Sequence, residues 1–143
     1  MSAANEPLRA AARQYVALMS DTVFYKEAVD FAQEHGPIGM KQLVSLMGFS
    51  RSWDDLIKHV RHQVGRDWVN REEVKQFYIE LQRYLSDSRR GLVQRVKTEF
   101  NAGIREFGGD TPTRAPEYWA QLFAQEFMQH LVAEARLRTE RLG

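Results

Sequence analysis

The chain has 143 residues with 20 basic and 19 acidic side chains, which gives a formal net charge of +1. Apolar residues make up 43% and charged residues 27%, as is typical of one soluble globular domain spanning residues 1–143. The absence of cysteine excludes disulfide scaffolds, Cys-ligated zinc, iron–sulfur clusters and thiol nucleophiles, and favours a cytoplasmic location. No apolar run of membrane-spanning length and no export signal is evident, so we expect no membrane contact.

Residues 7–36 predict two helical runs separated by a disturbance. Pro7 is a favoured first-turn residue, and Ser20-Asp21 offers side chains that compete for backbone hydrogen bonds. We therefore expect a kink or a fresh cap at Ser20-Asp21, then a second run that ends at Gly36-Pro37. The apolar face of the first run comprises Leu8, Ala12, Tyr15, Val16 and Met19.

Residues 38–64 predict a short helix, a glycine turn and a second helix. The short helix should span Ile38 to Met47 and close at Gly48, and Ser52 with Asp55 forms a variant of the capping box for the next helix. The same order occurs in helix-turn-helix proteins, where residues 50–58 would face the DNA major groove. Asp54 and Asp55 would repel phosphate there, so a plain helical corner is the other interpretation.

Three further helices are predicted in the second half. Asn70 with Glu73 forms a capping box, with Val69 placed for a hydrophobic staple, and starts a helix that reaches Leu85. A single helix should follow from Arg89 to the Gly108-Gly109 pair, and the last helix should begin at Pro116 and run to about Thr139. Because strand signals are nearly absent, the sequence predicts an all-α fold, a compact bundle of five or six helices.

Basic residues gather in the middle of the chain. Residues 1–50 carry 4 basic and 5 acidic side chains, residues 51–105 carry 12 and 8, and residues 106–143 carry 4 and 6. On a straight helix from Arg89, cations and amides would form one acid-free row that could follow a phosphate backbone. An ordinary solvated helix face is the alternative. The row comprises Arg90, Gln94, Lys97, Asn101 and Arg105.

Two lines of titratable residues are candidates for chemistry. Asp55, His59 and His62 have metal-ligand spacing on one helical face, but no fourth ligand is evident, and we favour ordinary helix pairing, such as Asp55 with His59. Glu126 and Glu134 flank His130 on the last helix, where we expect the carboxylates to pair with the imidazole. Motifs for nucleophilic catalysis, phosphate loops and zinc proteases are absent from the sequence, so we expect no catalytic residues, no metal and no cofactor.

The last helix carries more apolar surface than one face needs. Such a helix is either central in the bundle or exposed as a docking face. In the second case Tyr118, Trp119 and Leu122 would form a protein interface, with the aromatic residues as anchors.

The segment from Arg66 to Leu85 resembles the small subunits of type III CRISPR effector complexes. In that family a capped start leads into a helix with basic residues around an aromatic pair, and a later aromatic-rich helix closes the bundle. The matching residues here are Arg71, Lys75, Phe77, Tyr78 and Arg83, then Tyr118, Trp119, Phe123 and Phe127. The resemblance implies a non-catalytic helical protein of antiviral defence, which stacks in repeated copies along a guide–target duplex and contacts its backbone through Arg and Lys.

We therefore expect a non-enzymatic subunit of a larger assembly. Its partners would be other protein subunits, copies of itself, and the backbone of RNA or DNA. The first alternative is a protein-binding adaptor or regulator with no nucleic-acid role, and the second is the helix-turn-helix regulator. The expected nucleic-acid-binding residues are Arg71, Lys75, Arg83, Arg90, Lys97 and Arg105.

Overall fold

The computed structural model describes residues 10–35, 38–107 and 115–142. These residues form eight α-helices and one π-helical segment, and they contain no strand. The predicted all-α bundle is confirmed, with more and shorter helices than expected. The helix start expected at Pro7 and the stops expected at Gly36-Pro37 and Gly108-Gly109 lie outside the described residues.

The first three elements form one continuous helical run, α1 (Ala10–Met19), the π-helical segment η2 (Ser20–Phe24) and α2 (Tyr25–His35). The disturbance predicted at Ser20-Asp21 is confirmed as the start of η2. There the Thr22 hydroxyl donates to the Leu18 carbonyl at 2.7 Å, and Ser20 lies within 2.8 Å of His130 Nε2 on the last helix. Side-chain bonds of this kind compete with the regular helical pattern, and a π turn accommodates them.

Helix α3 (Met40–Phe49) is followed after a short corner by α4 (Trp53–Gly65). The predicted cap is confirmed, since Ser52 accepts a hydrogen bond from the Asp55 backbone N–H at 3.4 Å. The predicted closure at Gly48 is wrong, because α3 continues to Phe49 and ends where the Ser50 hydroxyl and N–H both bond the Leu46 carbonyl.

Helix α5 (Glu72–Ser86) does not begin with the predicted capping box. Asn70 adopts a left-handed backbone conformation with φ 61°, which asparagine tolerates better than most residues. Asn70 lies in a turn in which the Arg71 N–H donates to the Trp68 carbonyl at 2.9 Å. The N-cap of α5 is therefore Arg71, whose side chain forms no capping hydrogen bond. The predicted staple is also absent, because Val69 is 67% exposed.

The single helix predicted from Arg89 to Phe107 is two helices, α6 (Leu92–Lys97) and α7 (Asn101–Phe107). Between them the Phe100 N–H reaches back to the Arg95 carbonyl at 2.9 Å, and the Thr98 hydroxyl bonds the Gln94 carbonyl. The break places Phe100 between the rings of Phe24 and Phe123. It also brings Gly103 against Tyr15 of α1, so closely that a Cβ atom at residue 103 would overlap the Tyr15 ring.

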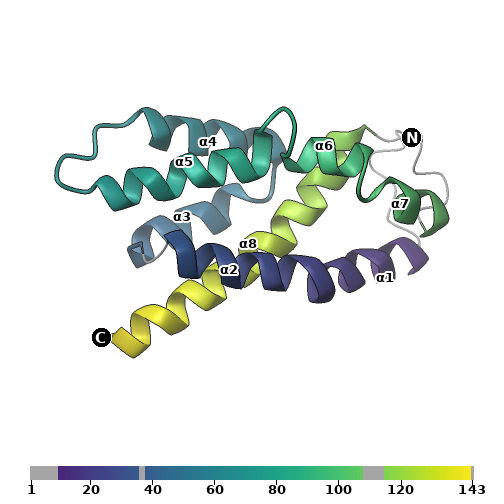
Figure 1. The fold of residues 1–143 in the computed structure, drawn as a ribbon, viewed down its shortest axis with the longest axis horizontal. Coiled ribbons are helices and arrows are strands. Elements are labelled where there is room, and N and C mark those ends of the chain that lie inside the picture. Colours follow the sequence, from purple (N-terminus) through teal and green to yellow (C-terminus); the bar gives the residue numbers. More distant parts are fainter. Residues whose placement is uncertain (1–9, 36–37, 108–114, 143) are drawn as a thin grey trace.

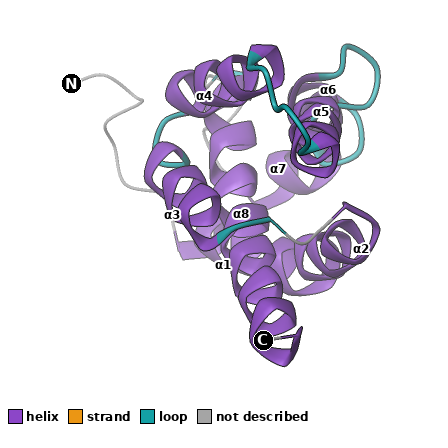
Figure 2. Cartoon of the chain, turned by 90° about the vertical axis from the view of Figure 1, so that its left-hand side faces the viewer, coloured by secondary structure: helices purple, strands orange, loops and turns teal. Residues whose placement is uncertain are grey.

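Helix α8 (Pro116–Leu142) occupies the centre of the bundle, which decides between the two interpretations of its broad apolar surface. It begins at Pro116, as predicted, and runs to Leu142, slightly beyond the predicted end. Figure 2 shows α2, α3, α4 and α5 arranged around it, and in Figure 1 it crosses the molecule diagonally. Its fully buried residues form the middle of the core: Trp119, Ala120, Phe123, Ala124, Phe127, Met128 and Leu131. Within the described residues, no helix combines the length and apolar character that crossing a membrane requires.

Candidate nucleic-acid interface

The predicted row of cations between Arg90 and Arg105 is not a continuous helix face. Arg90 precedes α6, Lys97 ends it, and Arg105 lies on α7 beyond the break. All three side chains are exposed, but the change of direction between α6 and α7 separates them. The prediction failed because it assumed one straight helix, whereas the helix is interrupted between Lys97 and Asn101, where Phe100 is buried.

The three predicted cations of the α5 region are in different surroundings. Arg71 lines a cleft at the start of α5, and Lys75 is half-buried one turn later. Arg83 is exposed and forms an ion pair with Glu80 at 2.6 Å. The two ends of α5 therefore present different electrostatic surfaces.

The cleft at the start of α5 is formed by α3, the end of α4, the segment between α4 and α5, and α5 itself. We call it the Trp68 cleft. Its volume is about 260 Å³. The lining residues are Lys41, Gln42, Ser45, His59, Gln63, Arg66, Trp68, Arg71 and Tyr78.

Local geometry explains how the chain builds this cleft. Trp68 is 5% exposed, and its indole N–H donates to the Gln63 carbonyl at the end of α4 at 2.8 Å. Its ring stacks on Tyr78 of α5, with the centroids 6.0 Å apart. Trp68 thus fixes the segment between the two helices, and the left-handed turn at Asn70 directs the chain from it into α5.

The cleft is strongly positive. Lys41 comes from α3, Arg66 and Arg71 flank Trp68 in the segment between α4 and α5, and no described Asp or Glu lines the cleft. The Arg66 and Arg71 guanidinium carbons lie 4.6 and 5.4 Å from the Trp68 ring centroid, an arrangement that favours the cations and holds them in place. Neither arginine forms an ion pair with a described residue. Burial raises the pKa of Tyr78 to about 12 although both arginines act in the opposite direction, so its hydroxyl stays neutral.

His59 contributes an unsatisfied polar atom. Its Nε2 is buried and has no hydrogen-bond partner among the described residues. The ring stacks on Phe49, with the centroids 4.2 Å apart. Burial lowers the pKa of His59, and the neighbouring His62 lowers it further, so the imidazole is neutral at pH 7. A neutral imidazole carries one N–H and can donate it from Nε2.

A second cleft, of about 600 Å³, lies between α2, the end of α5 and the segment before α6. It brings together two predicted residues, Arg83 and Arg90, but their charges are offset by Glu80 and Asp87. The Asp87 carboxylate accepts the backbone N–H groups of Arg90 and Arg89 at 2.9 and 3.1 Å, and these bonds lower its pKa. Its mixed charge makes this cleft a weaker phosphate site than the Trp68 cleft.

The predicted protein interface on the last helix requires correction. Trp119 is 1% exposed and packs in the core, whereas Tyr118 and Leu122 are half-buried. The correction follows from the central position of α8, because the apolar side chains of a central helix are buried in the core.

The two lines of titratable residues also differ from expectation. His59 packs against Phe49 instead of sharing an exposed face with Asp55 and His62, and the described residues contain no group of three that could hold a metal ion. On α8, His130 contacts Ser20 and the Tyr25 ring, so its predicted pairing with carboxylates is wrong. Glu134 instead pairs with Arg138 at 3.2 Å.

The helix-turn-helix interpretation gains little from the α3–α4 corner. Ser50, the first residue expected to face DNA, is buried and bonds within the corner. The exposed residues at the start of α4 are Asp54 and Asp55, whose charges oppose phosphate.

Sequence reasoning missed Lys41, Arg66 and Trp68 as site residues. Arg66 and Arg71 flank Trp68 in a segment between two helices, and this spacing was the available signal. Lys41 gave no signal, because it joins the cleft only through the packing of α3. Comparison of the chain with family models, curated proteins and solved structures gives no match.

Proposed function

We propose that this protein is a non-enzymatic helical subunit of a larger assembly that binds the phosphate backbone of nucleic acid at the Trp68 cleft. One observation carries the proposal: Lys41, Arg66 and Arg71 converge on a cleft that no described carboxylate lines. Arginine donates forked, charge-assisted hydrogen bonds to phosphate oxygens, and cations without internal partners are available for them.

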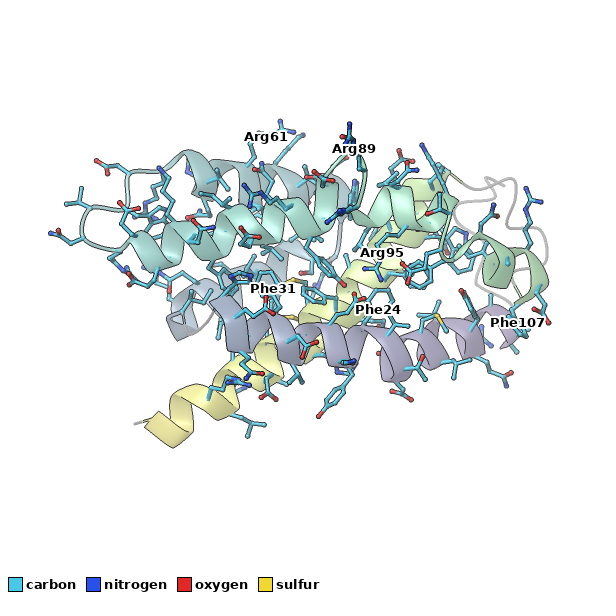
Figure 3. The ribbon with its side chains drawn as sticks, viewed as in Figure 1. Phe24, Phe31, Arg61, Arg89, Arg95 and Phe107 are labelled. Carbon is cyan, nitrogen blue, oxygen red and sulfur yellow. The ribbon has the colours of Figure 1, made fainter. Side chains whose placement is uncertain are left out.

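Two further exposed cations lie outside the cleft. Arg61 on α4 and Arg89 before α6 both project from the upper edge of the molecule in Figure 3, and both are exposed. Arg71 and Arg83 are separated by about 18 Å along the axis of α5, at 1.5 Å per residue. A duplex carries one phosphate per about 1.7 Å of its axis, so it offers contacts along this whole length.

The assembly part of the proposal follows the resemblance to type III CRISPR small subunits. Repeated copies along a guide–target duplex would each turn exposed Arg and Lys side chains towards the nucleic acid. Phosphate contacts are independent of base sequence, as binding to an arbitrary guide requires. The adaptor alternative is weakened by the burial of Trp119, which removes its main anchor.

Affinity purification from the source cells tests the proposal. The tagged chain would be compared with the triple variant Lys41→Glu/Arg66→Glu/Arg71→Glu and with Arg90→Glu/Lys97→Glu/Arg105→Glu. We expect nucleic acid and other subunits to accompany the unmodified chain, and nucleic acid to be lost with the first variant and largely kept with the second. Recovery of a partner protein without nucleic acid would contradict the proposal and favour the adaptor.

A further inference from the structure

We infer that the Trp68 cleft binds a terminal phosphate monoester of a nucleic-acid strand in preference to an internal phosphodiester. The inference rests on the proposed function and specifies the chemical group that its main site takes.

The cleft is small and concave. Its volume of about 260 Å³ lies just below the range of roughly 300–1,000 Å³ that is typical of small-molecule sites. A phosphate with its attached sugar fits this space, whereas a duplex does not. The end of a strand can enter such a cleft more deeply than a phosphate that has nucleotides on both sides.

The charge of the cleft matches a monoester. A phosphodiester carries one negative charge, whereas a phosphate monoester carries about −1.5 to −2 at pH 7 and offers three terminal oxygens. Lys41 of α3 and Arg66 and Arg71 of the segment between α4 and α5 supply three positive charges. Three positive charges exceed the single negative charge of a phosphodiester, so the cleft favours the more highly charged phosphate monoester.

Neutral donors complete the site. The side chains of Gln42, Ser45 and Gln63 line the cleft and bring amide N–H and hydroxyl donors to it. An oxygen-rich anion supplies acceptors for all three of these side chains.

The aromatic residues favour phosphate over a base. A stacking platform must offer an open ring face, but Trp68 is 5% exposed and is covered by Arg66, Arg71 and Tyr78. Tyr78 is 1% exposed. The rings therefore position the two guanidinium groups, and little aromatic surface is left for stacking a base.

Fluorescence anisotropy can test the inference on the full chain. The probes are one single-stranded RNA oligomer, labelled internally, with a 5′-phosphate, a 3′-phosphate or hydroxyl groups at both ends. The variants are Arg66→Ala/Arg71→Ala and, as a matched control, Arg136→Ala, which removes an exposed cation of α8 far along the chain from the cleft. Inorganic phosphate and ribose 5-phosphate serve as competitors, and circular dichroism checks that each variant is folded.

We expect at least tenfold tighter binding of one phosphorylated oligomer than of the hydroxyl oligomer. Arg66→Ala/Arg71→Ala should abolish this preference and Arg136→Ala should keep it. Ribose 5-phosphate should compete better than inorganic phosphate if the sugar also contacts the cleft, and equal competition would assign recognition to the phosphate group alone.

Two outcomes would overturn the inference, and they are distinguishable. Equal affinity for all three oligomers, reduced equally by Arg66→Ala/Arg71→Ala, would show backbone binding without end recognition and leave the proposed function in place. Failure of the unmodified chain to bind any oligomer would remove both the inference and the proposed function. The comparison among oligomers uses the unmodified chain, so it remains decisive even if a variant fails to fold.

Discussion

Arg95 and Glu27 form a double hydrogen-bonded ion pair that ties α6 to α2. The Arg95 Nη1 and Nη2 atoms donate to the two carboxylate oxygens of Glu27 at 2.9 and 2.8 Å. The Tyr84 hydroxyl of α5 donates to the same carboxylate at 2.7 Å, and Glu99 accepts from Arg95 Nε at 2.6 Å. Figure 3 shows Arg95 directed into the bundle towards Phe24. Helices α2, α5 and α6 are thus joined at the Glu27 carboxylate.

Replacing Arg95 should destabilise the fold strongly. The Arg95 side chain is 15% exposed, and Arg95→Met would leave the Glu27 carboxylate without its counter-ion. Removing one partner of such a pair costs about 3 kcal/mol in the free energy of unfolding. Urea denaturation measures this loss. Arg83→Ala is the matched control, because its exposed pair with Glu80 is worth at most about 1 kcal/mol. Similar losses in the two variants would contradict a stabilising role for the Arg95 pair.

His59 should make the stability of the protein depend on pH. Burial lowers its pKa in the folded state, so below about pH 6.5 the unfolded chain binds the proton more readily. The contribution of neutral His59 to the free energy of unfolding is complete above pH 6.5. It declines as the pH falls, until His59 is protonated in the folded state as well. The urea midpoints measured at pH 5, 6 and 7.5 should therefore differ less from one another in His59→Asn than in the unmodified chain. An unchanged pH slope in that variant would exclude His59 as the source.

Two helical glycines should respond to alanine in opposite directions. Gly103→Ala would force Tyr15 away from α7, and overpacking of this kind costs about 1–3 kcal/mol. At Gly48 the position that a Cβ atom would take has no neighbouring atom within 4 Å, so Gly48→Ala should stabilise α3 by about 0.5–1 kcal/mol. Thermal unfolding of the two variants tests both signs. Stabilisation by Gly103→Ala would show that the α1–α7 contact is looser than described.

Binding of single-stranded RNA should weaken with salt in proportion to the phosphates that the Trp68 cleft contacts. Each contact contributes about −0.7 to the slope of log affinity against log salt concentration, so three cations predict a slope of about −2. Arg66→Ala/Arg71→Ala should reduce its magnitude by about 1.4. Titrations at several salt concentrations measure the slopes. A slope near zero in the unmodified chain would indicate apolar docking instead of phosphate binding.

Sequence reasoning succeeded where a local interaction determines the structure. The Ser52 cap, the disturbance at Ser20 and the first turn at Pro116 each depend on neighbouring residues, and each is observed. Asn70 shows the opposite case, since its side chain suits a cap but its backbone is needed for the turn after Trp68. The break near Phe100 was also not predictable, because it depends on contacts with Phe24 and Phe123 from distant segments.

The candidate site was only partly accessible from sequence for the same reason. Arg71 was identified through the resemblance of residues 66–85 to the small subunits of type III CRISPR effector complexes. Its partnership with Lys41 exists only after α3 and α5 both pack against α4, and local spacing carries no information about that step. Trp119 failed as an interface residue because a wide apolar surface cannot by itself distinguish a central helix from a docking helix.

The central position of α8 has a consequence for biosynthesis. This helix is translated after every other described element, yet Phe123, Phe127 and Leu131 complete the core for all of them. At about 5–20 residues per second, its 27 residues take roughly one to five seconds to emerge. During that interval the apolar faces of α2, α5 and α6 have no central helix to pack against. A ribosome-bound chain that stops before Pro116 should therefore recruit chaperones that bind exposed apolar segments, and release them once α8 has entered the bundle.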